Sequence, residues 1–206
     1  MLCGFAIGLV FQATAGQIER NRAALLEKAV TQVLPGTSTT KGLVIDNGAL
    51  AMAATDRADF IASYDENGAV IGVAVPTGIM GYQDRIQMLL GYDPRSQSLT
   101  GFAVLESRET PGLGSKIGTD PAFLSSLRGL DVRLSGATLA NEVTLTTRGQ
   151  VRAPWQVDGI TGATISSKAV TRAISNTGPL LAVIRAGLPV IQETADSRES
   201  EDSDDA

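Results

Sequence analysis

The sequence predicts an α+β fold, with a twisted and mostly antiparallel sheet, packed helices, and an N-terminal helix or partial membrane anchor ahead of them. Short segments of β-type residues follow one another through the middle of the chain and are joined by turn residues, whereas the longer helical patterns lie near the two ends. Strands joined by tight turns pair antiparallel. With 206 residues, 43% of them apolar, the chain can form one domain with a sizeable core.

The chain begins with an apolar run at residues 2–11. The run is too short to span a bilayer, which takes about 20 apolar residues in a helix, and no Lys or Arg precedes it as in a secretory signal. Residues 13–15 resemble a small-residue cleavage site. Three interpretations remain: a cleaved signal, the second half of a membrane anchor, or the buried start of a helix. Composition alone favours the buried helix start, and the family resemblance given below favours a partial membrane anchor or signal segment at residues 1–16.

Residues 17–34 carry apolar side chains at helical spacing, and Pro35-Gly36 ends the predicted helix. This helix and a linker occupy residues 17–40, and the main domain follows at residues 41–190. Two hairpins are predicted in its first half. One forms around Asn67-Gly68, because Asn-Gly accepts positive φ, and the other forms around the turn at residues 93–96. Their four strands are residues 60–64, 69–75, 85–92 and 98–106.

The second half of the main domain mixes weaker strands with helices. Asp120-Pro121 opens a short helix, a longer helix begins near Thr164, and Gly178-Pro179 is predicted to break it ahead of a last helix. The predicted elements are strands at residues 132–134 and 142–147 and helices at residues 120–127, 164–176 and 180–186.

The formal net charge of -5 comes from the C-terminal tail, because half of the residues of the 193–206 segment are acidic and its one basic residue is Arg198. We expect residues 191–206 to be an acidic, disordered tail. The rest of the chain is close to neutral and poor in aromatic residues, so we expect no nucleic-acid partner.

Histidine is absent and Cys3 is the only cysteine. These counts exclude a Ser-His-Asp triad, a Cys-His pair, a His-ligated zinc or haem, an iron–sulfur cluster held by this chain and an internal disulfide. We therefore predict no catalytic side chain and no metal ligand. Any redox chemistry of this chain requires an organic cofactor.

The first segment that points to a ligand is residues 158–168, where small residues and hydroxyls stand just before a helix. The free amide groups and the positive end of the helix dipole favour an anion there. Gly162 and Ala163 let a phosphate approach the backbone, and Thr164 places a hydroxyl beside it. The simpler interpretation is that a Ser or Thr side chain caps an ordinary helix.

The second segment is residues 109–117, which begin Glu-Thr-Pro-Gly-Leu-Gly. Proline and two glycines indicate a tight, fixed loop that can lie against a flat ring. Leu113 would then be an apolar contact, and Glu109 or Thr110 a polar one. The simpler interpretation is an ordinary connection.

Together, Glu-Thr-Pro-Gly-Leu-Gly at residues 109–114 and Asp-x-x-Thr-Gly-Ala-Thr at residues 158–164 resemble the FMN-binding domain of the G subunit of the Rnf ion-translocating electron transport complex. The related C subunit of the sodium-pumping NADH:quinone oxidoreductase shares both motifs. The resemblance covers roughly residues 17–185. It implies that a flavin transferase moves FMN from FAD onto the last threonine of the second motif, which is Thr164, in a phosphoester bond.

The resemblance also implies roles for the other motif residues and for the chain as a whole. The recognition motif would be Asp158, Thr161, Gly162 and Ala163, and the flavin neighbours Glu109, Thr110 and Leu113. The chain would be an electron-transfer subunit of a membrane redox complex whose other subunits carry a flavin and iron–sulfur clusters. It would have a single-pass anchor in the bacterial inner membrane and a domain on the periplasmic side. Enzymatic activity is implied for the whole translocase, and none for the chain on its own.

A second copy of the motif core occurs at residues 135–138. Val132 stands where the pattern requires an acid, so we interpret this segment as a turn between strands and Thr164 as the attachment site. Two further residues near the motif are candidates for contacts with the cofactor. Trp155 is placed to stack on the flavin and Lys168 to pair with the phosphate, although a packed tryptophan and a solvated lysine are the commoner fates.

Two other functions remain open. One is a periplasmic covalent-flavin module that stands alone and serves a different reductase or a regulator. The other is a domain that binds no flavin and has a well-capped helix.

Overall fold

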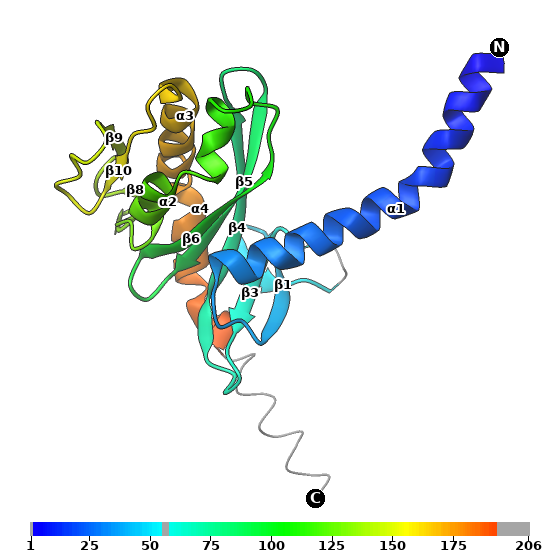
Figure 1. Cartoon of the computed structure of the whole chain (residues 1–206). Coiled ribbons are helices and arrows are strands. Elements are labelled where there is room, and N and C mark those ends of the chain that lie inside the picture. The colour runs from blue at the N-terminus through cyan, green and yellow to red at the C-terminus, as the bar shows by residue number, and fades with distance from the viewer. Residues whose placement is uncertain (1, 55–57, 193–206) are drawn as a thin grey trace, which may run out of the picture.

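The computed structural model describes residues 2–54 and 58–192, without the side chains of residues 2–13, 15, 18, 19 and 22. A six-stranded sheet forms the centre of the molecule, with helices on both faces (Figure 1). Its order is β2-β1-β3-β4-β5-β6, and every neighbouring pair is antiparallel. The strands are β1 (Thr39–Asp46), β2 (Ala49–Met52), β3 (Phe60–Tyr64), β4 (Val70–Met80), β5 (Arg85–Asp93) and β6 (Ser98–Glu106). The predicted mixture of helices with an antiparallel sheet is confirmed.

The two strands at the start of the sheet, β1 and β2, were not predicted from the sequence. They form a hairpin around Asn47 and Gly48, which have φ of 49° and 80°. Strand β4 is also longer than predicted and continues through Pro76. It pairs with β3 only as far as Ala74, so one side of the strand has no neighbour at Pro76, which is where a sheet tolerates proline.

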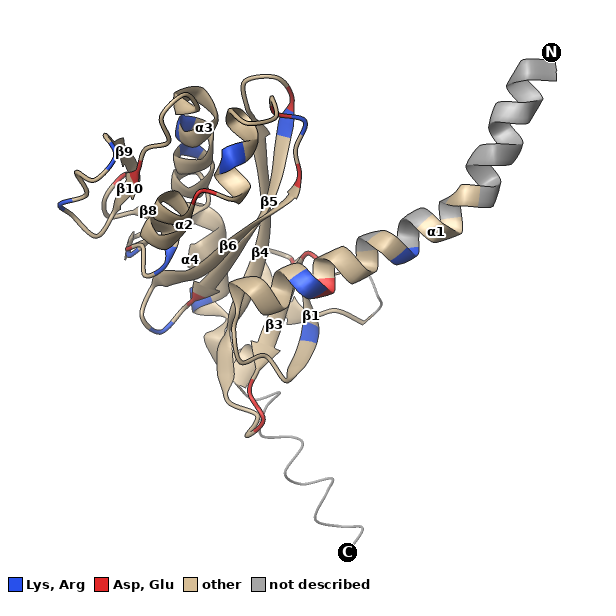
Figure 2. Ribbon diagram, in the orientation of Figure 1, with Lys and Arg blue, Asp and Glu red and all other residues tan. Residues whose placement is uncertain are grey.

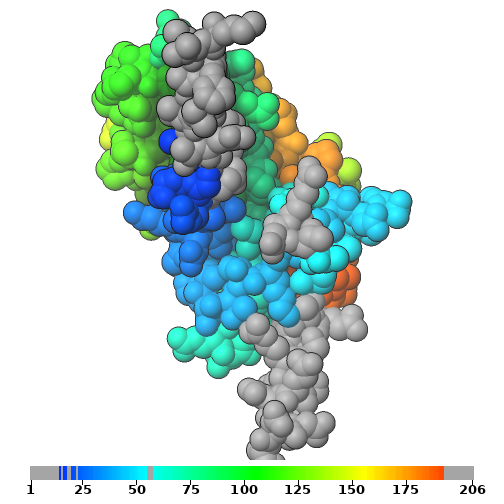
Figure 3. Space-filling view, turned by 90° about the vertical axis from the view of Figure 1, so that its right-hand side faces the viewer, coloured from blue at the N-terminus to red at the C-terminus, as the bar shows by residue number. Residues whose placement is uncertain are grey.

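The helices divide between the two faces of the sheet. They are α1 (Leu2–Val33), α2 (Pro121–Leu127), α3 (Thr164–Ser175) and α4 (Gly178–Ala186), with a short 3-10 helix, η1 (Gly114–Gly118). The larger core lies between the sheet and the later helices, and the end of α1 packs on the opposite face against Ala74, Leu89 and Ala103. In the space-filling view, the described part of α1 lies beside the segments that follow it in the chain (Figure 3).

The end of α1 is fastened to the sheet by close backbone contact. Val33 and Leu34 are fully buried, and the hydroxyl of Thr100 donates a hydrogen bond of 2.6 Å to the carbonyl oxygen of Val33. A Cβ atom at Gly101 would lie 2.7 Å from the Cα of Val33, so only glycine allows this approach. The first half of α1 extends away from the sheet (Figure 1).

The N-terminal segment predicted as a partial anchor or signal is helical in the structure, since residues 2–16 belong to α1. Among the described residues, no helix combines the length and the apolar character needed to cross a membrane. The predicted disordered tail falls outside the described residues from residue 193 onward. Ile191, which the prediction places in the tail, is instead buried, and its carbonyl oxygen accepts a hydrogen bond of 3.0 Å from the hydroxyl of Tyr64.

The weaker predicted strands are short in the structure. They are β7 (Leu134–Ser135) and β9 (Thr144–Thr146), and two further short strands, β8 (Thr138–Leu139) and β10 (Gln156–Asp158), were not predicted. Strands β7 and β8 form a hairpin around Gly136, which has φ of 66°, so the prediction of a turn at residues 135–138 is confirmed. The prediction that Gly178-Pro179 lies between two helices, ahead of a last helix at residues 180–186, is wrong in detail. Both residues belong to α4, because proline is favoured in the first turn of a helix.

Candidate functional site

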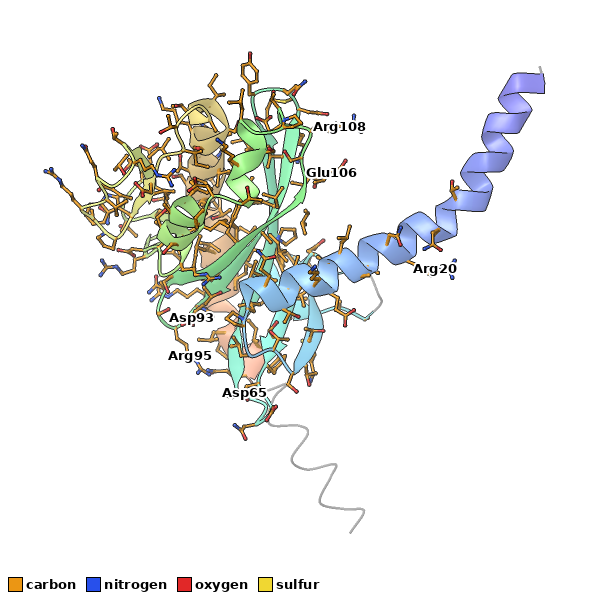
Figure 4. The ribbon with its side chains drawn as sticks, viewed as in Figure 1. Arg20, Asp65, Asp93, Arg95, Glu106 and Arg108 are labelled. Carbon is orange, nitrogen blue, oxygen red and sulfur yellow. The ribbon has the colours of Figure 1, made fainter. Side chains whose placement is uncertain are left out.

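The two motif segments meet at one end of the sheet. The loop after β6 faces the start of α3 across a cavity of about 350 Å³. Glu106 and Arg108, labelled in Figure 4, mark the end of the molecule where β6 passes into this loop. The cavity is lined by Tyr82, Glu109, Thr110, Leu113, Gly114, Gly162, Ala163, Thr164, Ile165 and Ser166.

The start of α3 has no capping side chain. Ala163 occupies the N-cap position, Thr164 is the first helical residue, and the first turn contains no acidic residue. The interpretation that a Ser or Thr caps this helix is therefore wrong. The first N–H groups of a helix have no partner within the helix, so here they are available to an external acceptor. An anion is the ligand that such a helix start favours.

Hydroxyl groups near the start of α3 differ sharply in their accessibility. Thr164 is exposed, and its hydroxyl has no hydrogen-bond partner in the described part of the chain. Ser166 and Ser167 are buried. Gly162, just before Thr164, has φ of 82°, which favours glycine, and Leu113 lies directly against it. Thr164 is thus presented to solvent at the edge of the cavity.

Glu109 connects three segments of the site from a position that is 5% exposed. One carboxylate oxygen accepts a hydrogen bond of 2.9 Å from the N–H of Gln83, and the other accepts one from the hydroxyl of Ser166. Burial raises the pKa of Glu109, but the hydrogen bonds from Gln83, Ser166 and the neighbouring amides outweigh it and hold the pKa below its ordinary value. Glu109 is therefore ionised at neutral pH.

Two glycines make room for this carboxylate. A Cβ atom at Gly81 would lie 2.5 Å from Oε1 of Glu109, and one at Gly114 would lie 2.5 Å from Oε2. Thr110 joins the same arrangement through a hydrogen bond of 3.2 Å from its hydroxyl to the side-chain oxygen of Gln83. Glu109 and Thr110 do line the cavity, but their polar groups already bind the protein.

The open side of the cavity is apolar. Tyr82, Leu113 and Ile165 are 67%, 49% and 55% exposed. Large apolar side chains gathered at a surface indicate a binding site when they surround a cavity. Leu113 was predicted from the sequence, whereas Tyr82 and Ile165 were missed. Helical spacing does reveal Ile165, because the core positions Val170 and Ile174 put it on another face of α3.

A second cavity of about 370 Å³ lies beside the same helix start. Its lining comprises Leu145, Thr146, Thr147, Arg148, Gly159, Ile160, Thr161, Gly162, Thr164 and Lys168. Basic residues lie on α3 and in the loop between β9 and β10 (Figure 2). Arg148 pairs with Asp120 at 2.9 Å. Lys168 is exposed and has no ion-pair partner among the described residues.

Of the remaining predicted residues, Thr161 lines the second cavity, whereas Asp158 lies outside the lining of both cavities. The carboxylate of Asp158 accepts a hydrogen bond of 2.6 Å from the N–H of Gly149, and the N–H of Asp158 donates one of 3.0 Å to Ser126. Asp158 thus fastens the loop between β9 and β10. Thr161 is exposed and lines the second cavity, whereas Trp155 lines neither cavity.

Known proteins resemble this chain in sequence and in fold. The model of a family described as FMN-binding domain matches residues 81–177. The G subunit of the ion-translocating oxidoreductase complex of Methanosarcina acetivorans is 31% identical over 172 residues, covering 82% of this chain and 81% of the relative. The G subunit of the Na(+)-translocating ferredoxin:NAD(+) oxidoreductase complex of Acetobacterium woodii is 27% identical over 179 residues, covering 82% and 80%.

Two solved structures share the fold. NqrC of Shewanella oneidensis has a TM-score of 0.61 and 17% identity, covering 87% of this chain and 99% of that one. The C subunit of the Na(+)-translocating NADH-quinone reductase of Parabacteroides distasonis has a TM-score of 0.59 and 20% identity, covering 80% and 94%.

Proposed function

The chain belongs to the family of G subunits of ion-translocating oxidoreductase complexes and contains an FMN-binding domain, and on that premise we propose that it carries FMN attached to Thr164 by a phosphoester bond. Bound FMN supplies the electron-transfer chemistry that the side chains of this protein lack. The chain then acts as an electron-transfer subunit of a redox-driven ion-translocating complex.

The observation that carries the proposal is the exposed hydroxyl of Thr164 at an uncapped helix start. The N–H groups of the first turn of α3 are available for phosphate oxygens, and the helix dipole favours their negative charge. Ser166, the nearest buried hydroxyl, donates to Glu109 and is not accessible. Gly162 and Ala163 bring no bulky side chain to the place where the phosphate would be.

The attachment requires a flavin donor and an enzyme that transfers it. With FAD as the donor, the hydroxyl oxygen of Thr164 forms a bond to the phosphorus of the FMN half. The bond between the two phosphates breaks, AMP leaves, and the hydroxyl proton is released. A dedicated flavin transferase is the proposed catalyst, because this chain has no histidine to act as a base at Thr164.

The first cavity suits the flavin ring. Tyr82, Leu113 and Ile165 offer apolar surface to a flat aromatic system, and the ring would be tethered within reach of them by its own phosphate. On the other side of the motif, Asp158 fastens the loop between β9 and β10, and Thr161 lines the second cavity. A covalent tether keeps the ring at this place without a binding equilibrium.

We also propose a location and partners for the chain. Residues 1–16 would anchor it to a bacterial inner membrane, and the FMN-binding domain at residues 41–190 would lie on the periplasmic side. Other subunits, bearing a flavin and iron–sulfur clusters, would exchange electrons with it. The apolar run at residues 2–11 and the relatives' names support this part of the proposal.

Co-expression with a flavin transferase tests the attachment. We expect the denatured protein band to fluoresce under ultraviolet light and the mass of the chain to rise by FMN less one water. Thr164→Ala should abolish both signals, and Thr138→Ala, which alters the second copy of the motif core, should leave both unchanged. A chain purified from its native host without any such adduct would contradict the proposed function.

A further inference from the structure

The two cavities beside Thr164 differ in chemistry. The first has apolar side chains on its open side, and the second is lined by Arg148 and Lys168 together with threonines, glycines, Leu145 and Ile160. No acidic side chain is among the residues that line the second cavity. Both cavities include Gly162 and Thr164, so a group bonded to Thr164 can extend into either.

The two cations of the second cavity are not equivalent. The guanidinium of Arg148 donates a hydrogen bond of 2.9 Å to Asp120, whose carboxylate balances its charge. The hydrogen bond from the N–H of Phe123 and the contact with Arg148 lower the pKa of Asp120. They outweigh burial, which raises it, so the pKa lies below its ordinary value. The ammonium of Lys168, by contrast, has no carboxylate partner in the described part of the chain. Lys168 is therefore the uncompensated positive charge of this cavity.

Helix geometry places that charge next to Thr164. Residues four apart in a helix lie on the same face, with their Cβ atoms about 5–6 Å apart. Thr164 and Lys168 are related in this way in α3, and both line the second cavity. The flexible side chain of Lys168 is long enough to bring its ammonium to a phosphate on Thr164.

We propose that Lys168 binds the phosphate that links FMN to Thr164, so that the second cavity holds the phosphate while the first holds the flavin ring. This inference rests on the proposed function. A phosphate esterified on both sides keeps one negative charge, and Lys168 offsets it where the N–H groups of α3 bind the same oxygens. Lys168 is then a cofactor-binding residue in addition to those of the motif.

Selective acetylation of lysines in the native protein tests this contact. Pairing with an anion favours the charged, unreactive form of an amine. We expect Lys168 to be acetylated several-fold more slowly in the FMN-bearing chain than in the unmodified chain, as measured by peptide mass spectrometry. Lys28, exposed on α1, is the internal control and should react equally in both.

The salt dependence of this protection distinguishes an ion pair from simple coverage by the ring. Raising the salt concentration to about 1 M shortens the screening length to about 3 Å and should abolish most of the protection. Protection that persists in high salt would mean that the ring covers Lys168, and it would overturn the inference. Equal acetylation with and without FMN would overturn it as well, whereas a chain that never acquires FMN would overturn the proposed function first.

Variants give an independent measurement. Lys168→Ala should lower the midpoint temperature of unfolding more in the FMN-bearing chain than in the unmodified chain, and Lys168→Arg should restore most of the difference. Arg172→Ala, at an exposed cation on the same helix outside the cavity, is the matched control and should have the same small effect on both forms. Identical losses for Lys168→Ala in the two forms would contradict a contact with the phosphate.

Discussion

Glu109 accepts a buried hydrogen bond from the hydroxyl of Ser166, and this contact joins the loop after β6 to the first turn of α3. The two residues are 57 positions apart in the sequence. The other carboxylate oxygen of Glu109 binds the N–H of Gln83, so one side chain fixes three segments around the cavity. The geometry in which Thr164 is presented therefore depends on a carboxylate whose two oxygens both accept hydrogen bonds from the protein.

Glu109→Gln should reduce stability at neutral pH and not in acid. The pKa of Glu109 is lower in the folded state than in the unfolded state, where it is about 4.3. The ionised carboxylate therefore stabilises the fold at pH values above the unfolded pKa, and this contribution is lost as the pH falls through the folded pKa. Since charge-assisted hydrogen bonds are about twice as strong as neutral ones, we expect a loss of about 1 kcal/mol near pH 7. Urea unfolding of both proteins measures it, and a pH-independent difference would contradict this role.

Gly81→Ala and Gly114→Ala should each destabilise the site. The added methyl group meets a carboxylate oxygen of Glu109 at 2.5 Å in either case, and overpacking of this kind costs about 1–3 kcal/mol. Gly118→Ala is the matched control, because its new methyl group would lie 3.5 Å from Val104, an ordinary contact. Denaturant unfolding of the three variants should separate the first two from the third.

Asp158 offers a way to separate folding from recognition by the transferase. Asp158→Ala removes the acceptor of the 2.6 Å hydrogen bond from Gly149 and should cost about 1–3 kcal/mol of stability. Asp158→Asn keeps an acceptor oxygen and should retain most of the stability. If the transferase recognises the carboxylate, the folded Asp158→Asn chain will acquire little FMN in co-expression. Full modification would show that the carboxylate only stabilises the loop between β9 and β10.

Leu113 should shield the flavin ring from water. In the FMN-bearing chain, Leu113→Ala opens the apolar side of the cavity, so we expect flavin fluorescence to become more accessible to a soluble quencher such as iodide while attachment continues. Leu25→Ala, at another exposed apolar residue on α1, is the control and should not alter quenching. Unchanged quenching in Leu113→Ala would place the ring elsewhere.

The sequence predicted those parts of the fold in which local signals are strong. The bounds of β3 and β6 were predicted residue by residue, because apolar runs there are bracketed by turn residues. The hairpin at Asn47-Gly48 was missed although it carries the same Asn-Gly signal, since its strand β1 mixes Gly, Thr and Lys with apolar residues. A strand whose side chains are only partly buried shows little alternation.

The candidate site was predicted in its two segments but not in its internal contacts. The resemblance of residues 109–114 and 158–164 to the motifs of a known family located these segments, and the structure brings residues of both to one cavity. Ala163 is the N-cap residue, with φ of -130° and ψ of 33°, a backbone detail that composition does not reveal. The bond between Glu109 and Ser166 depends on how the loop folds over α3, so no local pattern could predict it.

The most direct test of FMN attachment to Thr164 is the position of the flavin adduct in the purified, FMN-bearing chain. Trypsin separates the two copies of the motif core, leaving Thr164 in the peptide of residues 153–168 and Thr138 in that of residues 134–148. Tandem mass spectrometry should find FMN less one water on the first peptide, with the fragments assigning it to Thr164 rather than Thr161 or Ser166. An adduct on Thr138, on another hydroxyl of either peptide, or on neither peptide would contradict FMN attachment to Thr164.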